Sequence, residues 1–376
     1  MKTNAYLLMS KDAIVLHFLC ERNEFDEPIF SILRWENAAL APIGFFLKEQ
    51  PKDVQNEWLT AFLESRKAPK HRRHIQEILT QYQCNDLKGF IDVTHAVSLN
   101  DVFWVKGAES SLSWADVSLY RNEFDQLISI AAFDGTMSST VLSSSSPEFG
   151  TDGYYAKCWV REGEKIFLYK RGSDLFETEQ YSEYLAYQVA LKICPDAVPY
   201  DLTHYHGRVV SKCELFTNEN VGLVKAARVF GGEKPIPAML SYFESIGSAD
   251  TFRRMCILDA IILNPDRHYG NFGVLFDTDT MQVLRMAPVF DNNRALLPHL
   301  DEDQLASPAF HIKRCQPRLG SDFIVTARGL MTDDIRTDLE AMRGFTFAQH
   351  PAIEMPQARL FLLDRIIQQR ISEILD

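Results

Sequence analysis

The sequence lacks several patterns that would assign it to a specialised class of protein. No apolar run approaches the ~18 residues needed to cross a bilayer, the N-terminus has no basic-then-apolar segment typical of a signal peptide, and no internal repeat is found. The cysteines lie singly, without the paired spacing of zinc sites or of a disulfide framework, at Cys20, Cys84, Cys158, Cys194, Cys213, Cys256 and Cys315. We therefore expect reduced, mostly buried thiols, a cytoplasmic location and no membrane partner.

Positive charge is also scarce, because 39 Lys and Arg residues are outnumbered by 51 Asp and Glu residues, giving a formal net charge of −12. This balance disfavours direct binding to nucleic acid, which needs clustered cations to neutralise phosphates. One basic stretch departs from it, formed by Arg66, Lys67, Lys70, His71, Arg72, Arg73 and His74. We interpret this stretch as a solvated helix-and-loop face, since charge runs are usually that. A DNA-binding regulator is the alternative that rests on it.

The composition that is present, 46% hydrophobic and 24% charged over 376 residues, is that of a globular protein with two or three domains. Apolar and β-branched residues at 6–19 and 29–47 predict strands, and apolar spacing at 53–65 and 71–82 predicts helices. We assign residues 1–135 to a small α/β N-terminal accessory module. Within it, residues 99–118 look irregular.

A serine-rich segment, 136–147, marks a change in composition and is interpreted as a linker or mobile loop. The residues after it predict a hairpin at 154–170, a helix at 178–193 and a second hairpin at 205–216. These elements make a small α+β lobe, residues 136–217. Helical spacing then dominates residues 218–376, most clearly at 249–263 and 357–374, around a predicted hairpin with strands at 272–276 and 283–289.

The sharpest chemical pattern is Asp-Arg-His-Tyr-Gly-Asn at 266–271, which follows a buried helix and precedes a strand, with Asp291 at the end of the next strand. A carboxylate and an amide on one loop can take two different roles, proton acceptor and metal ligand. Asp266 can accept the proton of an attacking hydroxyl, and the amide oxygen of Asn271 can hold a magnesium ion. Asp291 would add an ionised oxygen, which magnesium prefers. Taken singly, each residue is better read as a turn cap or a strand end; the combination points to a site.

A second pattern pairs Lys170, at the end of a predicted strand, with Glu183 in the following helix. Kinases present a fixed positive charge to nucleotide phosphates in this way. Lys165 and Lys157 are rival lysines, and Glu179 is a rival partner. The strand ending in Cys213-Glu214-Leu215-Phe216 could then offer a hinge to adenine, although such a segment is more often an ordinary core strand.

The run Asn-Pro-Asp-Arg-His-Tyr-Gly-Asn-Phe-Gly at 264–273 resembles the catalytic loop of HipA-like serine/threonine kinases, and phosphatidylinositol 3/4-kinases carry the same Asp-Arg-His…Asn string. Further segments resemble those of bacterial HipA-domain proteins in the same order: residues 146–153, 157–159, 168–170, 181–183 and 213–216. Two departures are clear. Pro265 precedes the aspartate, and Asp291-Asn292-Asn293 stands where many eukaryotic protein kinases have Asp-Phe-Gly.

The resemblance implies an α+β, two-lobed protein-kinase-like fold, with a small β-rich N-lobe and a mainly helical C-lobe, preceded by the α/β module. It also implies roles for single residues. Asp266, Asn271 and Asp291 would be catalytic, the last two as magnesium ligands. Nucleotide would be bound by Lys170, Glu183, Glu214, Phe216, Gly150, Gly153 and Lys157. Ser146 falls where HipA kinases carry a regulatory autophosphorylated serine; Ser143, Ser144 and Ser145 are its neighbours.

The function that follows is an ATP- and Mg²⁺-dependent kinase that phosphorylates a serine or threonine hydroxyl of a protein and autophosphorylates. Phosphoryl transfer needs positioned charges and metals more than covalent chemistry, so this residue set suffices in kind. An antitoxin-like regulatory protein is a candidate partner. Two alternatives stay open: a lipid or small-molecule kinase, and a pseudokinase or regulatory binding module that acts through residues 1–130.

Overall fold

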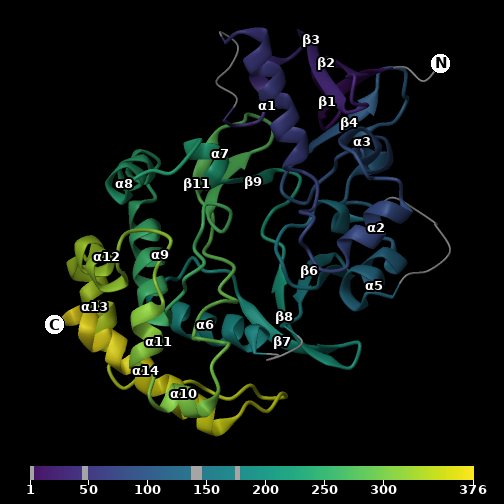
Figure 1. Ribbon diagram of the computed structural model, residues 1–376. Helices are drawn as coiled ribbons and strands as arrows, with labels where there is room; N and C mark the ends of the chain where they lie inside the picture. Colours follow the sequence, from purple (N-terminus) through teal and green to yellow (C-terminus); the bar gives the residue numbers. More distant parts are fainter. Residues whose placement is uncertain (1–3, 45–49, 137–145, 174–177) are drawn as a thin grey trace. The chain divides into compact units, whose positions relative to one another are not determined.

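The computed structural model describes residues 4–44, 50–136, 146–173 and 178–376 (Figure 1). The chain forms two compact units, each assembled from several segments. The first unit is Met1–Tyr169, Leu215–Val224 and Phe276–Val283, and the second is Lys170–Glu214, Lys225–Leu275 and Leu284–Asp376. The division into three parts at residues 135 and 217 is a different partition of the chain and stays a prediction.

A four-stranded antiparallel sheet in the order β3-β2-β1-β4 begins the first unit. Its strands are β1 (Ala5–Ser10), β2 (Ala13–Arg22), β3 (Pro28–Trp35) and β4 (Phe103–Gly107). Pairing sets Ala5 of β1 opposite Leu19 of β2, and Tyr6 of β1 opposite Gly107 of β4. One face buries a core that includes Leu7, Trp104 and Trp114. The sheet therefore joins segments that lie far apart in the sequence.

Short helices and a hairpin complete the first unit. They are η1 (Ala38–Leu40), α1 (Lys52–Glu64), α2 (Ile75–Gln81), α3 (Leu87–Thr94), α4 (Trp114–Val117), α5 (Gln126–Asp134), η2 (Pro147–Gly150), β5 (Lys157–Glu162) and β6 (Lys165–Lys170). Helix α1, the hairpin and the strands at 6–19 confirm the sequence predictions. The expected irregular stretch 99–118 is wrong, because it contains β4 and α4, and residues 45–47 of the predicted second strand lie outside the described residues.

The basic stretch at 66–74 is not a solvated face throughout, which corrects the interpretation from sequence. The guanidinium of Arg66 is buried and donates to both carboxylate oxygens of Asp101, at 2.8 and 2.9 Å. Arg72 is buried as well and lies 2.6 Å from Glu148. The predicted helix at 71–82 begins only at Ile75, after His74 adopts a φ of +62°. Two of the cations thus stabilise the fold, which weakens the DNA-binding alternative.

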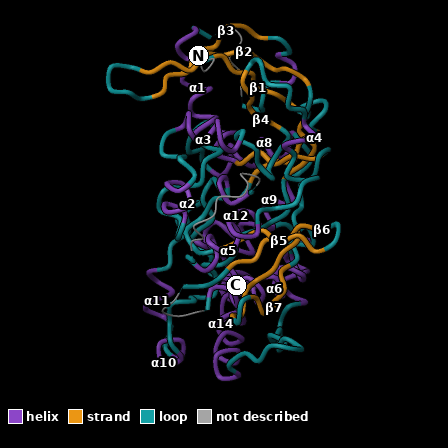
Figure 2. The backbone as a smooth tube through the Cα atoms, turned by 90° about the vertical axis from the view of Figure 1, so that its right-hand side faces the viewer, coloured by secondary structure: helices purple, strands orange, loops and turns teal. Residues whose placement is uncertain are grey.

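The second unit starts with helix α6 (Glu179–Ile193) and the antiparallel pair β7 (Tyr200–Tyr205) and β8 (Arg208–Glu214), which turns at His206 and Gly207 as predicted. Helix α9 (Ala249–Ile262) is its most buried element and packs against α6, α8, α12 and α14 (Figure 1 and Figure 2). The other helices of the second unit are α7 (Ala226–Phe230), α8 (Ile236–Ser245), α10 (Glu302–Ala306), α11 (Ala309–Arg314), α12 (Phe323–Leu330), α13 (Asp333–Ala341) and α14 (Gln357–Leu375). The unit is mainly helical, as the periodicity predicts.

The chain passes between the units within or beside strands. It crosses within β6, between Tyr169 and Lys170, and again between Glu214 and Leu215. Three further crossings lie within the strands β9 (Val221–Lys225), β10 (Gly273–Asp277) and β11 (Val283–Met286). Strands β10 and β11 occupy the positions predicted for the strand pair at 272–289. All seven cysteines are free thiols, as expected. Among the described residues, no helix combines the length and the apolar character that a membrane span requires.

Candidate functional site

The end of helix α9 positions the predicted catalytic loop. Leu263 closes the helix with a φ of +53°, and Pro265 cannot extend it. The side-chain oxygen of Asn264 then accepts the backbone N–H of Asp266 at 3.1 Å. A buried helix thus delivers Asp266 to the start of a tight loop, and its carboxylate remains about one-third exposed, at 32%.

Hydrogen bonds within the loop hold Asp266 and Asn271 together. The side-chain Nδ2 of Asn271 donates to the backbone oxygen of Asp266 at 3.0 Å, so the carbonyl Oδ1 is the atom left to bind a cation. The backbone N–H of Gly270 bonds Nδ1 of His268 at 3.0 Å. His268 therefore orients the loop, and Asp266 and Asn271 share one turn of chain.

Arg267 joins this loop to the segment that carries Asp291. Its guanidinium is buried and donates to the backbone oxygens of Asn271, at 2.9 Å, and of Phe290, at 2.5 Å. The same group donates to both carboxylate oxygens of Asp259 in α9, at 2.9 and 3.0 Å, and to Asn292 at 2.6 Å. The guanidinium of Arg267 thereby holds the backbone of Asn271, one predicted magnesium ligand, and of Phe290, the residue before Asp291, the other.

Asp259 is a supporting residue that the sequence reasoning missed. Burial raises the pKa of its carboxyl group, and the neighbouring guanidinium of Arg267 acts in the opposite direction. The sequence feature that could have identified it is a single acidic residue within the apolar run Ile257-Leu258-Asp259-Ala260-Ile261. A charged side chain is rarely buried in such a run without a partner.

Asp291 is held in an unusual backbone conformation. Its φ of +60° lies in the left-handed region, which aspartate tolerates better than most residues with a side chain. Its backbone N–H donates to the hydroxyl of Tyr200 at 3.1 Å, and its Oδ1 lies 2.8 Å from Nζ of Lys170. The carboxylate is thus fixed beside the lysine predicted to bind phosphate.

Lys170 and Glu183 form the pair that the sequence predicted. Nζ of Lys170 donates to Oε1 of Glu183 at 2.6 Å, and the hydroxyl of Ser211 donates to the second oxygen, Oε2. Burial lowers the pKa of Lys170, but the carboxylates of Asp291 and Glu183 outweigh it and raise the pKa well above its ordinary value. The rival partner Glu179 instead accepts the backbone N–H of Ser173 at 2.9 Å. Lys170 therefore carries a fixed positive charge.

The remaining predicted nucleotide residues are divided between the units. Glu214 ends β8 in the second unit and is exposed, whereas Phe216, Gly150, Gly153 and Lys157 belong to the first unit. There, Gly153 has a φ of +96°, and Nζ of Lys157 donates to the backbone oxygen of Asp152 at 2.9 Å. Their roles in nucleotide binding stay predictions.

Ser146, the predicted regulatory serine, begins η2 in the first unit. It is 2% exposed, and its Oγ accepts the backbone N–H of Glu148 at 3.3 Å. Ser143, Ser144 and Ser145 lie outside the described residues.

The donor set in the second unit fits magnesium. Asn271 and Asp291 offer an amide and a carboxylate oxygen, and Mg²⁺ prefers such hard oxygen ligands while keeping several waters. Clusters of at least three His, Cys, Asp or Glu residues suited to a metal are not found among the residues that the structure describes. A site of few protein ligands, completed by nucleotide phosphates, is therefore the kind of metal site that these residues can form.

Comparisons with known proteins give matches at the level of structure. No family model and no curated protein matches the sequence. The toxin HipA of Shewanella oneidensis MR-1, solved with HipB and its operator DNA, aligns over 99% of both chains with a TM-score of 0.54 and 11% identity. The proinflammatory kinase CtkA of Helicobacter pylori aligns over 58% of this chain and 91% of its own, with a TM-score of 0.44 and 18% identity. The chain therefore has the mixed α and β, HipA-like kinase fold expected from its sequence.

Proposed function

We propose that this protein is an ATP- and Mg²⁺-dependent kinase that transfers the γ-phosphate to a serine or threonine hydroxyl of a protein. The observation that carries the proposal is the buried Arg267 brace. It joins the backbone of Asn271 to that of Phe290, next to Asp291, while Lys170 contacts the Asp291 carboxylate at 2.8 Å. These contacts support the proposal, because the proposed base, the two proposed magnesium ligands and the positively charged lysine all belong to the second unit.

Each group has a task in the proposed reaction. The acceptor hydroxyl oxygen forms a bond to the γ-phosphorus, the bond to the bridging oxygen of the β-phosphate breaks, and ADP leaves. Asp266 accepts the hydroxyl proton on its carboxylate. Asn271 and Asp291 would hold Mg²⁺, which neutralises phosphate charge when bound. Lys170, held by Glu183, binds the phosphates and keeps them aligned.

The regulatory part of the proposal concerns Ser146 and a partner protein. A phosphate on Ser146 would place about −1.5 to −2 charges beside Glu148, so the start of η2 would have to open. We keep Ser146 as the proposed autophosphorylation site. The solved HipA complex contains HipB, and an antitoxin-like protein is the proposed partner here as well. The net charge of −12 favours such a partner, rather than this chain, as the DNA-contacting component.

The test is transfer of labelled γ-phosphate from Mg-ATP to the protein itself and to a general protein substrate. Asp266→Asn and Asp291→Asn keep the shape of each side chain, and we expect each to reduce transfer by about 10²- to 10⁴-fold. Asp334→Asn, an exposed aspartate in α13, is the matched control and should transfer at the wild-type rate. Peptide mapping of the same reaction locates the autophosphate and should find it on Ser146.

Other results of this transfer assay would indicate one of the alternative functions. Mg-ATP binding without transfer to any acceptor would indicate a pseudokinase, and transfer only to lipids or small molecules would indicate the alternative kinase classes. Full activity in Asp266→Asn would remove Asp266 as the base. Phosphate found elsewhere than Ser146 would withdraw the regulatory assignment alone.

A further inference from the structure

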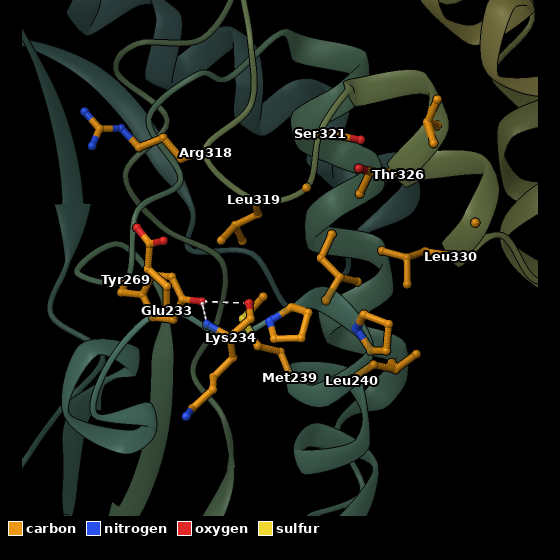
Figure 3. Close-up of a pocket in the computed structure, with 16 residues that line it drawn as sticks. Glu233, Lys234, Met239, Leu240, Tyr269, Arg318, Leu319, Ser321, Thr326 and Leu330 are labelled. Carbon is orange, nitrogen blue, oxygen red and sulfur yellow. Dashed lines mark hydrogen bonds between the residues drawn. The ribbon is translucent and has the colours of Figure 1, made fainter.

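The second unit contains a pocket of about 650 Å³ immediately beside the catalytic loop (Figure 3). Its wall is formed by the segment that starts α8, by α12, by the residues preceding α12 and by Tyr269 of the loop itself. Arg318 lines the pocket, and its Nε also lies 3.3 Å from Oδ1 of Asp266. Arg318 therefore contacts both the proposed base, Asp266, and the pocket.

The pocket wall is rigidly attached to the loop. The hydroxyl of Tyr269 accepts the backbone N–H of Lys234 at 2.7 Å and donates to the backbone oxygen of the same residue at 3.0 Å, the pair of bonds drawn in Figure 3. The backbone oxygen of Tyr269 accepts the N–H of Ala227 at 2.9 Å. A group bound in the pocket would thus hold a constant position relative to Asp266, three residues before Tyr269. Such fixed placement is what phosphoryl transfer requires of its acceptor.

The lining favours an apolar side chain at the centre and an acidic group at the edge. Met239, Leu319 and Leu330 form a largely buried apolar floor, and the hydroxyl groups of Ser321 and Thr326 are the polar groups beside it. Of the charged residues that line the edge, Lys234 and Arg318 are cations and Glu233 is an anion, and Arg318 also faces the carboxylate of Asp266. Arg318 is 61% exposed and can pivot toward an incoming carboxylate. An apolar floor with a few placed polar groups suits a ligand with an apolar body, and a large amino-acid side chain is such a ligand.

We propose that this pocket binds a large apolar side chain of the polypeptide acceptor, near its phosphorylated serine or threonine, with an acidic residue beside it contacting Arg318. The inference rests on the proposed kinase function and specifies its substrate class. It assigns Arg318 as a specificity-determining residue that pairs with Asp266 and is drawn to the acceptor when the acceptor binds.

The experiment uses the full chain, Mg-ATP and a positional-scanning peptide library with a fixed serine or threonine acceptor. Wild type should select Leu, Met or Phe at one position and Asp or Glu at an adjacent one. Gly329→Phe places a ring in the pocket from α12, at a position where a Cβ atom meets nothing within 4 Å. We expect it to raise KM for the selected peptide by about 10-fold or more, as expected when apolar complementarity is lost. Arg318→Ala should abolish the acidic preference and keep the apolar one.

Gly107→Phe is the matched control, because Gly107 is equally open to a Cβ atom and lies in the first unit. It should retain the wild-type peptide preference and KM. Mg-ATP affinity and the urea unfolding midpoint of Gly329→Phe establish that the variant is folded. Because Arg318 is an exposed residue, Arg318→Ala tests the same proposal with little risk to folding.

The possible outcomes distinguish a failure of the pocket assignment from a failure of the kinase proposal. Transfer that depends on Asp266 but shows no apolar preference, or a preference unchanged in Gly329→Phe, would overturn the pocket assignment and leave the kinase proposal standing. Transfer that persists in Asp266→Asn would overturn the proposed mechanism. Absence of transfer to every peptide, with transfer to a lipid or small molecule, would overturn both the protein acceptor and the pocket assignment.

Discussion

At the scale of single residues, the charge balance around Lys170 is the feature most open to measurement. Its Nζ lies 2.6 Å from a carboxylate oxygen of Glu183 and 2.8 Å from one of Asp291. Glu183 is 0% exposed, and burial raises the pKa of its carboxyl group while Lys170 and Ser211 act to lower it. Removing the lysine therefore leaves Glu183 buried without its main counter-charge.

Lys170→Met should destabilise the protein by about 3–5 kcal/mol at neutral pH, because a buried carboxylate loses its partner. Loss of the lysine raises the pKa of Glu183 further. A group whose folded-state pKa is raised stabilises the fold when protonated, and this contribution is lost as pH rises through that pKa. The penalty of Lys170→Met should therefore be smaller at pH 5 than at pH 8, as measured by urea unfolding.

The control is the double variant Lys170→Met with Glu183→Gln, in which no buried carboxylate remains to titrate. It should recover part of the lost stability and show no such difference between pH 5 and pH 8. A single-variant penalty that is equal at both pH values would show that Glu183 is not the group responsible. Both variants should lose Mg-ATP binding, since each lacks the cation proposed to bind the phosphates.

At the scale of elements, the C-terminal end of α9 supports the predicted catalytic loop through the Asp259–Arg267 pair. The two side chains share two hydrogen bonds, and Arg267 is 1% exposed. Lysine cannot reproduce the forked donor geometry of a guanidinium, which here serves a carboxylate, two backbone oxygens and an amide at once. A substitution at Arg267 should therefore change both the stability of α9 and the geometry of the loop at 266–271.

Arg267→Lys should cost about 1–3 kcal/mol of stability, because the lysine keeps the charge but leaves buried acceptors unsatisfied, and should reduce kcat for phosphoryl transfer. The apolar pair Arg267→Met with Asp259→Leu should recover stability, because no buried charge is left, but not kcat, because the donors to Asn271 and Phe290 are gone. Urea unfolding and steady-state kinetics measure the two effects separately. Arg365→Lys, at an exposed site in α14, is the matched control. Recovery of both properties would show that Arg267 only fills space.

At the scale of the whole molecule, the two proposed magnesium ligands and the proposed phosphate-binding lysine belong to one unit. Lys170, Asn271 and Asp291 all belong to the second unit, although the first contributes the predicted phosphate loop. Ligand binding stabilises the folded state by mass action, and so Mg-ATP should stabilise the part of the chain that contains these residues.

Saturating Mg-ATP, at 100 times its dissociation constant, should stabilise the protein by about 2.7 kcal/mol against unfolding. Hydrogen exchange should report the largest gain in protection in α6 and in residues 264–273. Chelation of magnesium with EDTA, or the substitution Asp291→Asn, should remove most of this gain. Equal stabilisation with and without the metal would argue against Asn271 and Asp291 as its ligands.

Local patterns in the sequence were enough to predict the longer elements. Helices α1, α6, α9 and α14 carry repeated apolar spacing over many residues, and the turn at His206-Gly207 has its own chemistry. Strand β4 escaped prediction because five residues carry little periodicity and its partner β1 lies far earlier in the chain. Helix α3 escaped because a short helix depends on its N-cap, Asp86, and on packing against the sheet.

The sequence by itself determined which chemical groups are present and in what order: the Asp266–Asn271 loop, whose 3.0 Å hydrogen bond spans five residues, then Asp291, and the side chains of Lys170 and Glu183. Only the tertiary structure decided that Lys170 meets Asp291, that Arg267 is a buried brace, and that Arg318 lies between Asp266 and a pocket. The reason is physical. Periodicity and turn chemistry act over a few residues, whereas these contacts join segments that are brought together by burial of the whole unit around α9.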